Sequence, residues 1–540
     1  MTRTTCLGIA ASVVMTGIGF SGEPPGEPAP RALPNVVFIL ADDLGWMDTA
    51  VYQRRQEPRG TGAYYETPNI DRLAEQGMLF TQAYVSPMCS PTRALLLTGV
   101  HNAESGILKA TYECEHDANY DEIVAPRYKK EFAVLPATNR MVLDGSYVTF
   151  AEALNKTGYT CGFLGKWHVG CHNKIPSATP EAQGFQTIGY YDTGGSPYLN
   201  WRPAWEAVGK PMDEPEDQYL TVAESHAACR FIEQNKANRF LLYYCTGGVH
   251  SPFQDDPKTG YREHFEKKGK QGWLDDRSAP FPVYAAMVKS LDDAVGGIMK
   301  QLEDTRGPDG TPLSENTLVI FLSDNGGINR YQFAPEGSEL SNKVITSNLP
   351  LRGAKGNLYE GGIRVPLIVR WPGKVKPGTV CEVPVDCCDI HSLLLEAGGL
   401  EKKNGAGSVL SLLRDPSDAA GYGRDTFFFH FPFWWPYAEV GSPLPEDPPM
   451  SAVRKGNYKL IYYYTGKVEL YDLASDPGER HDLSERFPEK TEELRQTLQA
   501  WLKDRVAPRY IPAKNPNFDQ SATPYGEFRD PMGLWNAGQQ

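Results

Sequence analysis

The stretch NVVFILADD, residues 35–43, decides the fold: a mostly apolar run of strand length is followed at once by two aspartates. An unbroken apolar run of this kind is typical of a strand that is buried on both faces of a parallel sheet. Similar runs recur further along the chain, at residues 240–245 (FLLYYC), 317–322 (TLVIFL) and 365–370 (VPLIVR). They predict a sheet with several buried strands, and the two aspartates lie where the first of these strands ends.

Helical patterns lie between the predicted strands. In residues 283–302 the apolar positions recur at the three- and four-residue spacing of a helix. Further helical patterns cover residues 69–77, 149–158, 220–235 and 389–398. Strands that alternate with helices predict an α/β fold, with a large, mostly parallel sheet sandwiched between helices. Ligands of such sheets bind beyond the carboxyl ends of the strands, so the residues that directly follow each strand carry the most information.

Composition and charge narrow the function classes. The chain has 540 residues, of which 41% are hydrophobic and 22% charged; this excludes a disordered chain and supplies material for a sizeable core. Lysine and arginine number 54 against 67 aspartates and glutamates, which gives a net charge of −13. Proteins that bind a phosphate backbone are usually basic, so we expect no nucleic acid as a principal partner.

The N-terminus predicts export. Arg3 precedes the mostly apolar run LGIAASVVMTGIGF, residues 7–20, and small residues then offer a cleavage site. We interpret residues 1–21 as a signal peptide and residues 22–34, rich in Pro, Gly and Glu, as a linker. The alternative is a frayed apolar N-terminus. The run is too short to span a bilayer, so we expect an exported protein, periplasmic or secreted, without stable membrane insertion.

The composition and the hydrophobic pattern of the sequence change near residue 424. Aromatic residues and prolines crowd residues 427–437, residues 458–464 and 467–473 read as short antiparallel strands, and residues 492–506 as a helix. We therefore predict two units, a larger α/β domain over residues 35–423 and a smaller C-terminal α+β subdomain with a short antiparallel sheet over residues 424–540.

Cysteine usage fits an exported chain. Of the ten cysteines, Cys6 leaves with the signal peptide and Cys89 is taken up below. The other eight permit disulfides, although the spacing does not define their pairing: they are Cys114, Cys161, Cys171, Cys229, Cys245, Cys381, Cys387 and Cys388. Paired C-x-x-C spacing is absent from the sequence, so we expect no structural zinc.

Two pairs of oxygen-bearing side chains follow predicted strands. Asp42 and Asp43 come directly after the first strand, and Asp324 and Asn325 lie just beyond the run 317–322. Carboxylate and amide oxygens at one sheet edge are the ligands that Ca²⁺ or Mg²⁺ prefers. Asp after a strand also caps helices or starts turns, and for either pair alone this would be the better interpretation. The two pairs together, each flanked by glycine, favour a metal site.

Residues 88–99, MCSPTRALLLTG, predict a helix that begins near Cys89, because Pro91 suits its first turn. A helix N-terminus lowers the pKa of a thiol and favours an anion. The residues alone therefore fit a reactive cysteine at an oxyanion-binding helix start, or equally an inert, half-buried cysteine.

The string CSPTR at residues 89–93, followed by LTG at 97–99, resembles the C-x-P-x-R…T-G signature of the type I sulfatases, the formylglycine-dependent, arylsulfatase-like family of the alkaline phosphatase superfamily. Other segments of that family's pattern follow in the expected order, and the similarity spans roughly residues 34–500. They are NVVFILADD at 35–43, GKWH at 165–168, GGVHSPF at 247–253, SDNG at 323–326, LRGAKG at 351–356, EGGIRVP at 360–366 and ELYDL at 469–473. The resemblance implies an alkaline-phosphatase-like fold in which residues 35–423 are the catalytic sulfatase domain.

The resemblance also implies the site residues. One Ca²⁺ per chain would be held by Asp42, Asp43, Asp324 and Asn325, with the modified Cys89 and the substrate's sulfate completing the shell. Arg93 would hold the modified residue, and Lys166 and Lys355 would bind and neutralise the sulfate. His168 would act as a base on the modified Cys89, and His250 as the acid for the leaving alcohol. His430, in the string FFFHFPFWW, is a further candidate for substrate contact, with packing as the alternative.

In that family the cysteine is oxidised after translation to Cα-formylglycine (3-oxoalanine), so a maturation enzyme is an implied partner. A hydrated aldehyde has two hydroxyls: one attacks sulfur, and the other remains to break the sulfated intermediate. A serine has a single hydroxyl, so its sulfate ester would lack the second hydroxyl that breaks the intermediate.

The expected function is therefore hydrolysis of a sulfate ester to alcohol and inorganic sulfate. Aromatic residues and the long segment 103–145 favour a sulfated glycan over a small aryl sulfate or choline sulfate as substrate. Two rival functions stay open: a phosphodiesterase or phosphonate hydrolase of the same superfamily, and an inactive sulfated-glycan-binding protein. The complete set of candidate catalytic residues argues against the second.

Overall fold

The computed structural model describes residues 33–56, 62–112, 132–172, 174–276, 278–330, 343–403, 405–436 and 446–523, together with Met1, Lys130, Leu340 and Met532. Nearly all of the predicted signal peptide and linker lies outside these residues. Among the described residues a ten-stranded sheet runs through the centre in the order β10-β2-β9-β8-β1-β7-β4-β5-β6, and β11 pairs with β2. Its strands are β1 (Asn35–Ala41), β2 (Met78–Tyr84), β4 (Thr160–Lys166), β5 (Gln186–Tyr191), β6 (Gly209–Lys210), β7 (Phe240–Cys245), β8 (Thr317–Ser323), β9 (Arg364–Arg370), β10 (Thr379–Cys381) and β11 (Val385–Asp386).

The first strand lies in the middle of the sheet and is buried along its whole length. It pairs in parallel with β7 on one side and with β8 on the other. Its side chains alternate between two cores: Val36, Phe38 and Leu40 pack on one face, and Val37 and Ile39 on the other. The apolar run therefore meets helices on both faces, as its composition predicts.

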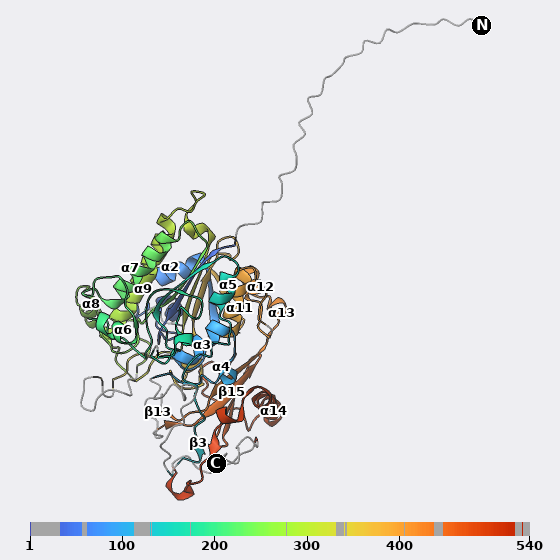
Figure 1. The fold of residues 1–540 in the computed structure, drawn as a ribbon. Coiled ribbons are helices and arrows are strands. Elements are labelled where there is room, and N and C mark those ends of the chain that lie inside the picture. Colours follow the sequence, from blue (N-terminus) through green and yellow to red (C-terminus); the bar gives the residue numbers. More distant parts are fainter. Residues whose placement is uncertain are drawn as a thin grey trace.

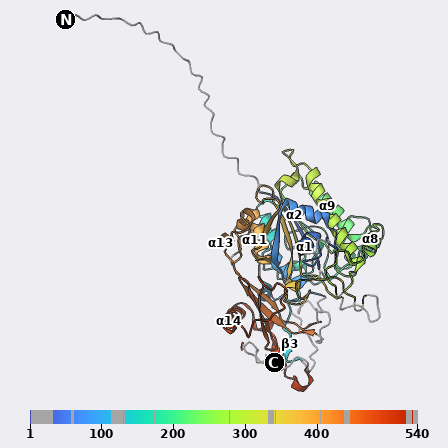
Figure 2. The same cartoon turned by 180° about the vertical axis from the view of Figure 1, so that it is seen from behind.

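Helices cover both faces of the sheet, and they separate to its two sides in Figures 1 and 2. On one face lie α2 (Pro68–Gln76), α7 (Leu220–Gln234), α8 (Tyr261–Lys268) and α9 (Pro282–Asp304). On the other lie α3 (Cys89–Thr98), α5 (Phe150–Asn155), α11 (Cys387–Ala397) and α12 (Val409–Arg414). The short helices are α1 (Ala50–Gln56), α4 (Asn102–Ser105), α6 (Arg202–Val208), α10 (Glu360–Ile363) and α13 (Ala419–Tyr422), with 3₁₀ turns at Pro176–Ala178, Leu313–Asn316, Pro508–Tyr510 and Gln520–Ala522. The predicted α/β sandwich is confirmed.

One predicted parallel strand runs the other way. The run VPLIVR forms most of β9, which pairs antiparallel with both β8 and β2. A parallel neighbour of β8 would need a crossover that carries the chain back to the far edge of the sheet. Instead, the described residues between β8 and β9 hold no more than the four-residue helix α10, so β9 starts near the end where β8 stops. The sheet is thus mixed, although most of its strand pairs are parallel.

A smaller antiparallel sheet, with strand order β12-β15-β16-β17, follows in the sequence and lies below the main sheet in Figure 1. Its strands are β12 (Thr426–Phe431), β15 (Met450–Lys455), β16 (Tyr458–Tyr463) and β17 (Val468–Asp472). Helix α14 (Pro488–Arg505) packs on β15 and β16. Two further pairs are β13 (Trp435–Pro436) with β14 (Glu446–Asp447), and β3 (Val134–Leu135) with β18 (Ala513–Lys514). The antiparallel C-terminal strands and the helix agree with the prediction, while the exact domain boundary stays a prediction.

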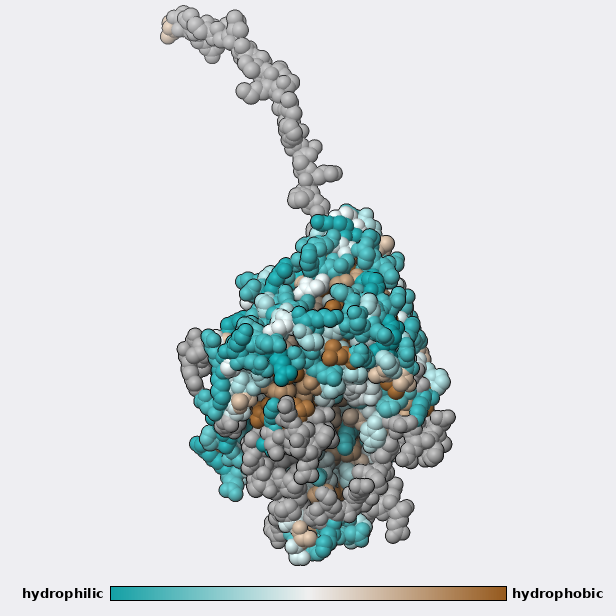
Figure 3. Space-filling model, turned by 90° about the vertical axis from the view of Figure 1, so that its left-hand side faces the viewer, coloured by the Kyte–Doolittle hydropathy of each residue, from teal (hydrophilic) through white to brown (hydrophobic). Residues whose placement is uncertain are grey.

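The described cysteines are mostly free thiols. Cys171 is disulfide-bonded, and the free ones are Cys89, Cys161, Cys229, Cys245, Cys381, Cys387 and Cys388. Among the described helices, none is long and apolar enough to cross a bilayer. The face turned to the viewer in Figure 3 is mainly hydrophilic, with apolar residues in small patches.

A buried ionic cluster joins the antiparallel sheet to the main sheet. The ammonium of Lys459, on β16, lies 2.9 Å from Glu360 on α10 and 2.8 Å from Glu479, and all three side chains are fully buried. Tyr84 on β2 donates a hydrogen bond of 2.6 Å to Glu360. Burial alone would raise the pKa of Glu360, but Lys459, Arg364 and Arg454 outweigh burial and lower this pKa to about 2. One ammonium therefore balances carboxylates from both parts of the chain.

We predict that Lys459→Met lowers the free energy of unfolding by about 3–5 kcal/mol, because it leaves Glu479 buried without its cation and removes one of the cations that balance Glu360. Lys455→Met is the matched control on β15, since its ammonium pairs with Glu493 at an exposed position and such a pair contributes no more than about 1 kcal/mol. Urea unfolding of the two variants measures the difference. Equal losses would mean that the buried cluster does not stabilise the junction.

Candidate active site

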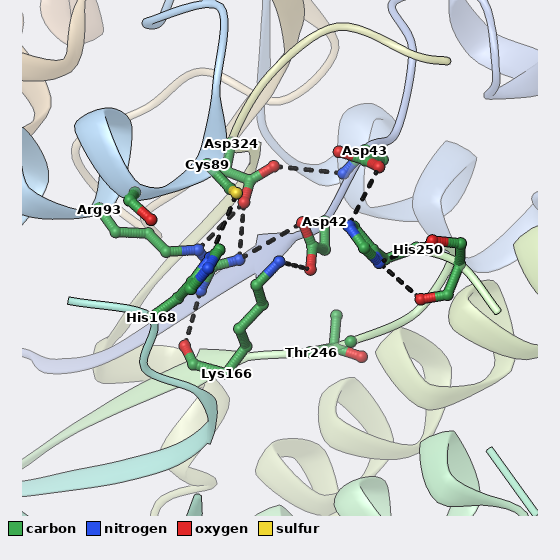
Figure 4. A network of polar contacts seen from close by, with 12 residues as sticks. Asp42, Asp43, Cys89, Arg93, Lys166, His168, Thr246, His250 and Asp324 are labelled. Atoms are coloured by element: carbon green, nitrogen blue, oxygen red, sulfur yellow. Dashed lines mark hydrogen bonds and ion pairs between the residues drawn. The ribbon is translucent and has the colours of Figure 1, made fainter. Parts of the chain in front are cut away.

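The two pairs of predicted metal ligands meet at one edge of the main sheet. Since β1 and β8 pair in register, with Ala41 beside Ser323, the residues that follow them become neighbours. Asp42, Asp43, Asp324 and Asn325 are all buried to within 1% of full burial. The backbone N–H of Asp43 donates to Asp324 Oδ1 at 3.2 Å, a contact visible in Figure 4.

Three cations balance these carboxylates. Lys166, the last residue of β4, donates to Asp42 Oδ2 at 2.6 Å, and Lys355 donates to Asp43 Oδ1. Arg93 donates to Asp324 Oδ2 through Nε at 3.1 Å and Nη2 at 2.7 Å. Figure 4 shows Arg93 and Lys166 converging on the aspartates from one side. Burial would raise the pKa of Asp43, but Lys355 and His250 outweigh it and hold that pKa below its usual range. Burial and the neighbouring Asp42 raise the pKa of Asp324 to about 6.

Cys89 is the first residue of α3 and Arg93 lies one turn further, so the two side chains share one face of the helix. The thiol is 2% exposed, and burial raises its pKa. Burial outweighs the nearby lysines, so for the unmodified residue the structure favours the second of the two interpretations, an inert thiol. Unmodified Cys89 is a neutral thiol at neutral pH.

His168 is oriented toward Cys89. Its Nε2 lies 2.8 Å from the carbonyl of Thr111 and its Nδ1 lies 3.3 Å from Cys89 Sγ. A carbonyl only accepts, so Nε2 carries the proton and the lone pair of Nδ1 points at position 89. Thr111 bonds to both sides of this contact. Its hydroxyl donates to the carbonyl of His168 at 2.8 Å, and its N–H donates at 3.0 Å to Oγ of Ser90, the residue next to Cys89. Burial, Lys166 and Arg93 hold the pKa of His168 well below its usual value, so the ring is neutral and able to accept a proton.

His250 faces the aspartates from the other side. Its Nε2 lies 3.6 Å from Asp43 Oδ2, and its Nδ1 lies 2.6 Å from the carbonyl of Ser251. Burial and Lys166 lower the pKa of His250 to about 3, so this ring is also neutral at neutral pH. To serve as an acid, it must gain a proton at Nε2, and a nearby anion favours that charged form.

Glu224 supports the turn that carries His250. Its carboxyl group accepts hydrogen bonds from the hydroxyl of Thr246 at 2.7 Å, the hydroxyl of Tyr244 at 3.0 Å and the N–H of Gly247 at 3.4 Å. Burial raises the pKa of Glu224 to about 7. Sequence reasoning missed this residue; the signal is an acid on the buried face of α7, between alanines and leucine at helical spacing.

A cavity of about 350 Å³ opens over these groups. Cys89, His168, His250 and Lys355 are among the residues that line it. Lys109, Tyr112, Arg330 and Trp435 also line it. Neither Lys109 nor Arg330 was predicted as a site residue from the sequence, whereas Tyr112 lies in the segment 103–145 and Trp435 in the aromatic segment 427–437. These four residues come from three separate segments of the chain, the loop after α4, the loop after β8 and the short strand β13, so no local motif contains them all.

His430 does not reach this cavity. It lies on β12 and is 1% exposed. Both ring nitrogens are used inside the protein: Nδ1 lies 2.8 Å from the hydroxyl of Ser451, and Nε2 lies 2.8 Å from the carbonyl of Tyr510. The hypothesis that His430 touches substrate is therefore withdrawn in favour of packing, because β12 directs this ring into the core of the small sheet.

The acidic cluster fits a hard cation. Asp42, Asp43 and His250 offer ligand atoms within 4.8 Å of one another, and so do Asp42, Cys89 and Asp324. Three buried oxygens, Asp42 Oδ1, Asp43 Oδ2 and Asn325 Oδ1, accept no hydrogen bond from any described residue. Buried acceptors without partners are costly, and carboxylate and amide oxygens are the ligands of Ca²⁺ and Mg²⁺. Arg93, Lys166 and Lys355 donate no hydrogen bond to these three oxygens, which are therefore available as ligands of such an ion.

Comparison with known proteins agrees with this geometry. The sulfatase family pattern matches residues 34–400, and a pattern described as N-sulphoglucosamine sulphohydrolase, C-terminal, matches residues 354–507. A protein named sulfatase from Formosa agariphila is 30% identical over 553 residues, which cover 89% of this chain and 91% of that protein. N-acetylgalactosamine-6-sulfatase of Homo sapiens is 28% identical over 514 residues, 88% of this chain and 85% of that protein.

Solved structures share the fold. Ps i-CgsB in complex with k-i-k-neocarrahexaose has a TM-score of 0.65 at 23% identity, over 89% of this chain and 95% of that one. BT4656 in complex with its substrate D-glucosamine-2-N,6-O-disulfate has a TM-score of 0.59 at 18% identity, over 89% of this chain and 98% of that one. The family pattern covers well over half of the chain, and with it the Cys89 helix and both pairs of candidate metal ligands. The chain therefore belongs to the sulfatase family and is a sulfuric ester hydrolase.

Proposed function

We propose that this protein is an exported sulfatase that removes sulfate from a sulfated carbohydrate, using a formylglycine made from Cys89 and a bound Ca²⁺. The observation that carries the proposal is the position of Cys89, buried at the start of α3 with its Sγ 3.3 Å from a neutral His168. A cysteine that burial keeps neutral is a poor nucleophile, so the site gains from its conversion. Formylglycine, when formed and hydrated, supplies a hydroxyl nucleophile and a second hydroxyl for release of sulfate.

The chain's own residues prepare this site. His168 Nδ1 is directed at position 89 and accepts a proton from the hydrated group there. Lys166 and Lys355 lie where negative charge grows on the sulfate oxygens, and fixed cations in a dry site stabilise that charge without reorganising. A Ca²⁺ held by Asp42, Asp43, Asp324 and Asn325 would polarise the sulfate oxygens. Water supplies the oxygen and the protons that end on inorganic sulfate and the alcohol.

The proposed substrate class is a sulfated glycan. Its support is the named substrates of similar proteins, since human N-acetylgalactosamine-6-sulfatase and BT4656 both act on sulfated sugars. The aromatic residues Tyr112 and Trp435 on the cavity wall suit the apolar faces of sugar rings. The proposal that the protein is exported rests on residues 1–21. Activity would also require a formylglycine-generating maturation enzyme as a partner.

The activity is tested on paired sulfate and phosphate esters of the same phenol, followed by a desulfation screen of defined sulfated oligosaccharides. We expect release of sulfate and much slower release of phosphate. Faster release of phosphate would favour the alternative function, a phosphodiesterase or phosphonate hydrolase. Sugar binding without any release of sulfate would indicate an inactive glycan-binding protein.

A second prediction concerns the metal. Chelation should abolish turnover, added Ca²⁺ should restore it, and Asp324→Ala should lose the bound ion, because it removes one ligand and leaves Arg93 without its carboxylate. Metal analysis of the purified protein and its thermal unfolding midpoint with and without Ca²⁺ are the readouts. Asp293→Ala, at an exposed position, is the matched control and should keep one Ca²⁺ per chain. Full Ca²⁺ content in Asp324→Ala would refute the assigned site.

A third prediction tests the role of His250. A sugar alkoxide needs a proton as the S–O bond breaks, whereas an activated phenolate leaves without help. General acid catalysis contributes roughly 10²–10⁴-fold where it is needed, which corresponds to about 3–5 kcal/mol. His250→Ala should therefore reduce kcat/KM for a sugar sulfate by about that factor and clearly less for an activated aryl sulfate. Equal losses on both substrates would show that His250 positions the sulfate and does not protonate the leaving group.

A further inference from the structure

Two cations on the wall of the catalytic cavity have no acidic partner among the described residues. Lys109 and Arg330 both line this cavity, and neither forms an ion pair with a described carboxylate. In Arg330, the guanidinium Nε is buried and has no hydrogen-bond partner. By contrast, Lys166 and Lys355 in the same site each hold an aspartate.

The ammonium of Lys109 rests on aromatic rings. It lies 5.6 Å from the ring centroid of Phe433 and 5.6 Å from that of Trp435. Burial lowers the pKa of Lys109, and the negative charge of Glu446 opposes this shift, although Lys109 forms no ion pair with a described carboxylate. The described contacts of this half-buried ammonium are ring faces, which balance its positive charge only in part. An incoming anion would supply the negative charge that balances the rest.

Both cations are held in place by the elements that build the catalytic site. The backbone N–H of Lys109 donates to Asn139 Oδ1 at 2.9 Å, and two residues later Thr111 connects Ser90 to His168. Arg330 follows Asn325 by five residues and forms an isolated bridge with Val344. That pairing continues to Thr346, whose N–H donates to the carbonyl of Ile328 at 3.2 Å. The backbone segments that carry the two positive groups are therefore held in place beside the reacting groups.

These cations are distinct from those that act on the nucleophile. The largest electrostatic effects on Cys89 come from Lys166 and Lys355 among the cations, and those two lysines already face the sulfate position. Lys109 instead contacts the rings of residues 433 and 435, which follow β12. We call the part of the cavity wall formed by Lys109, Tyr112, Arg330 and Trp435 the outer wall.

We infer that the outer wall of the catalytic cavity is a subsite for a second anionic group of the substrate, bound by Lys109 and Arg330. The inference rests on the proposed sulfatase function and narrows its substrate to a glycan that carries two negative groups close together. The second group is a sulfate or a carboxylate: a guanidinium binds either through paired hydrogen bonds, and the ammonium binds either as a point charge. Trp435 and the exposed Tyr112 would flank the sugar that bears it.

The test compares three oligosaccharides that share one scissile sulfate. One has no further charge, one carries a second sulfate, and one carries a neighbouring uronate carboxylate. We expect the wild-type enzyme to prefer one of the two doubly charged forms by at least about ten-fold in kcat/KM, and the form preferred identifies the second anion. Absence of any preference, which needs no variant to observe, would overturn the inference.

Variants then assign the preference to the two residues. Lys109→Gln and Arg330→Gln should each reduce the preference for the doubly charged substrate several-fold, mainly through KM, whereas Lys109→Arg should keep most of it. Lys300→Gln, which removes the same charge at an exposed position of α9, should leave the preference unchanged. Thermal unfolding midpoints show that each variant is folded. Equal losses on singly and doubly charged substrates would mean that these cations bind the scissile sulfate, and would also overturn the inference.

The outcomes separate this inference from the function on which it rests. Failure to release sulfate from any sugar contradicts the proposed substrate class and the subsite together. Release of sulfate from sugars at the same rate with or without a second anion contradicts the subsite alone.

Discussion

The balance of buried charge at the ends of β1 and β8 is the constraint on which the rest of the site depends. Asp42, Asp43 and Asp324 lie within hydrogen-bond reach of one another or of shared partners, with almost no exposed surface. Carboxylates in such a cluster repel one another strongly in a low-dielectric interior, and without cations their burial would be prohibitive. Lys166, Lys355 and Arg93 supply that compensation, each from a different part of the chain.

This balance determines how the surrounding elements are placed. Arg93 reaches Asp324 only if α3 begins beside the sheet edge, and that position puts Cys89, one turn earlier, in the wall of the cavity. The same guanidinium donates to the carbonyl of Lys166 at 2.7 Å, which links α3 to the end of β4. Three oxygens of the cluster accept no hydrogen bond from a described residue, so one electrostatic arrangement brings together the proposed nucleophile, the proposed metal ligands and the lysines proposed to bind sulfate.

Much of the fold and the inner site was predictable from the sequence, for identifiable reasons. Strands β1, β7 and β8 are unbroken apolar runs, and residues that follow parallel strands meet by geometry, so Asp42 and Asp324 were foreseeable neighbours. Strands β2, β4 and β5 were missed, because polar residues or glycines interrupt MLFTQAY, TCGFLGK and QTIGYY. The direction of β9 depends on a connection without a crossover, and the burial of Cys89 and His430 depends on tertiary packing. Lys109 and Arg330 come from segments more than 200 residues apart, and no sequence pattern joins them.

The central claim is that Cys89 acts only after conversion to formylglycine. Its most direct test is mass spectrometry of the peptide containing residue 89, prepared from active protein that has been exported by a host with the maturation enzyme, with Cys89→Ala as the inactive reference. We expect the aldehyde form to be present, with a fraction that rises in proportion to specific activity across preparations. Full sulfatase activity in protein whose Cys89 is entirely unmodified would contradict it.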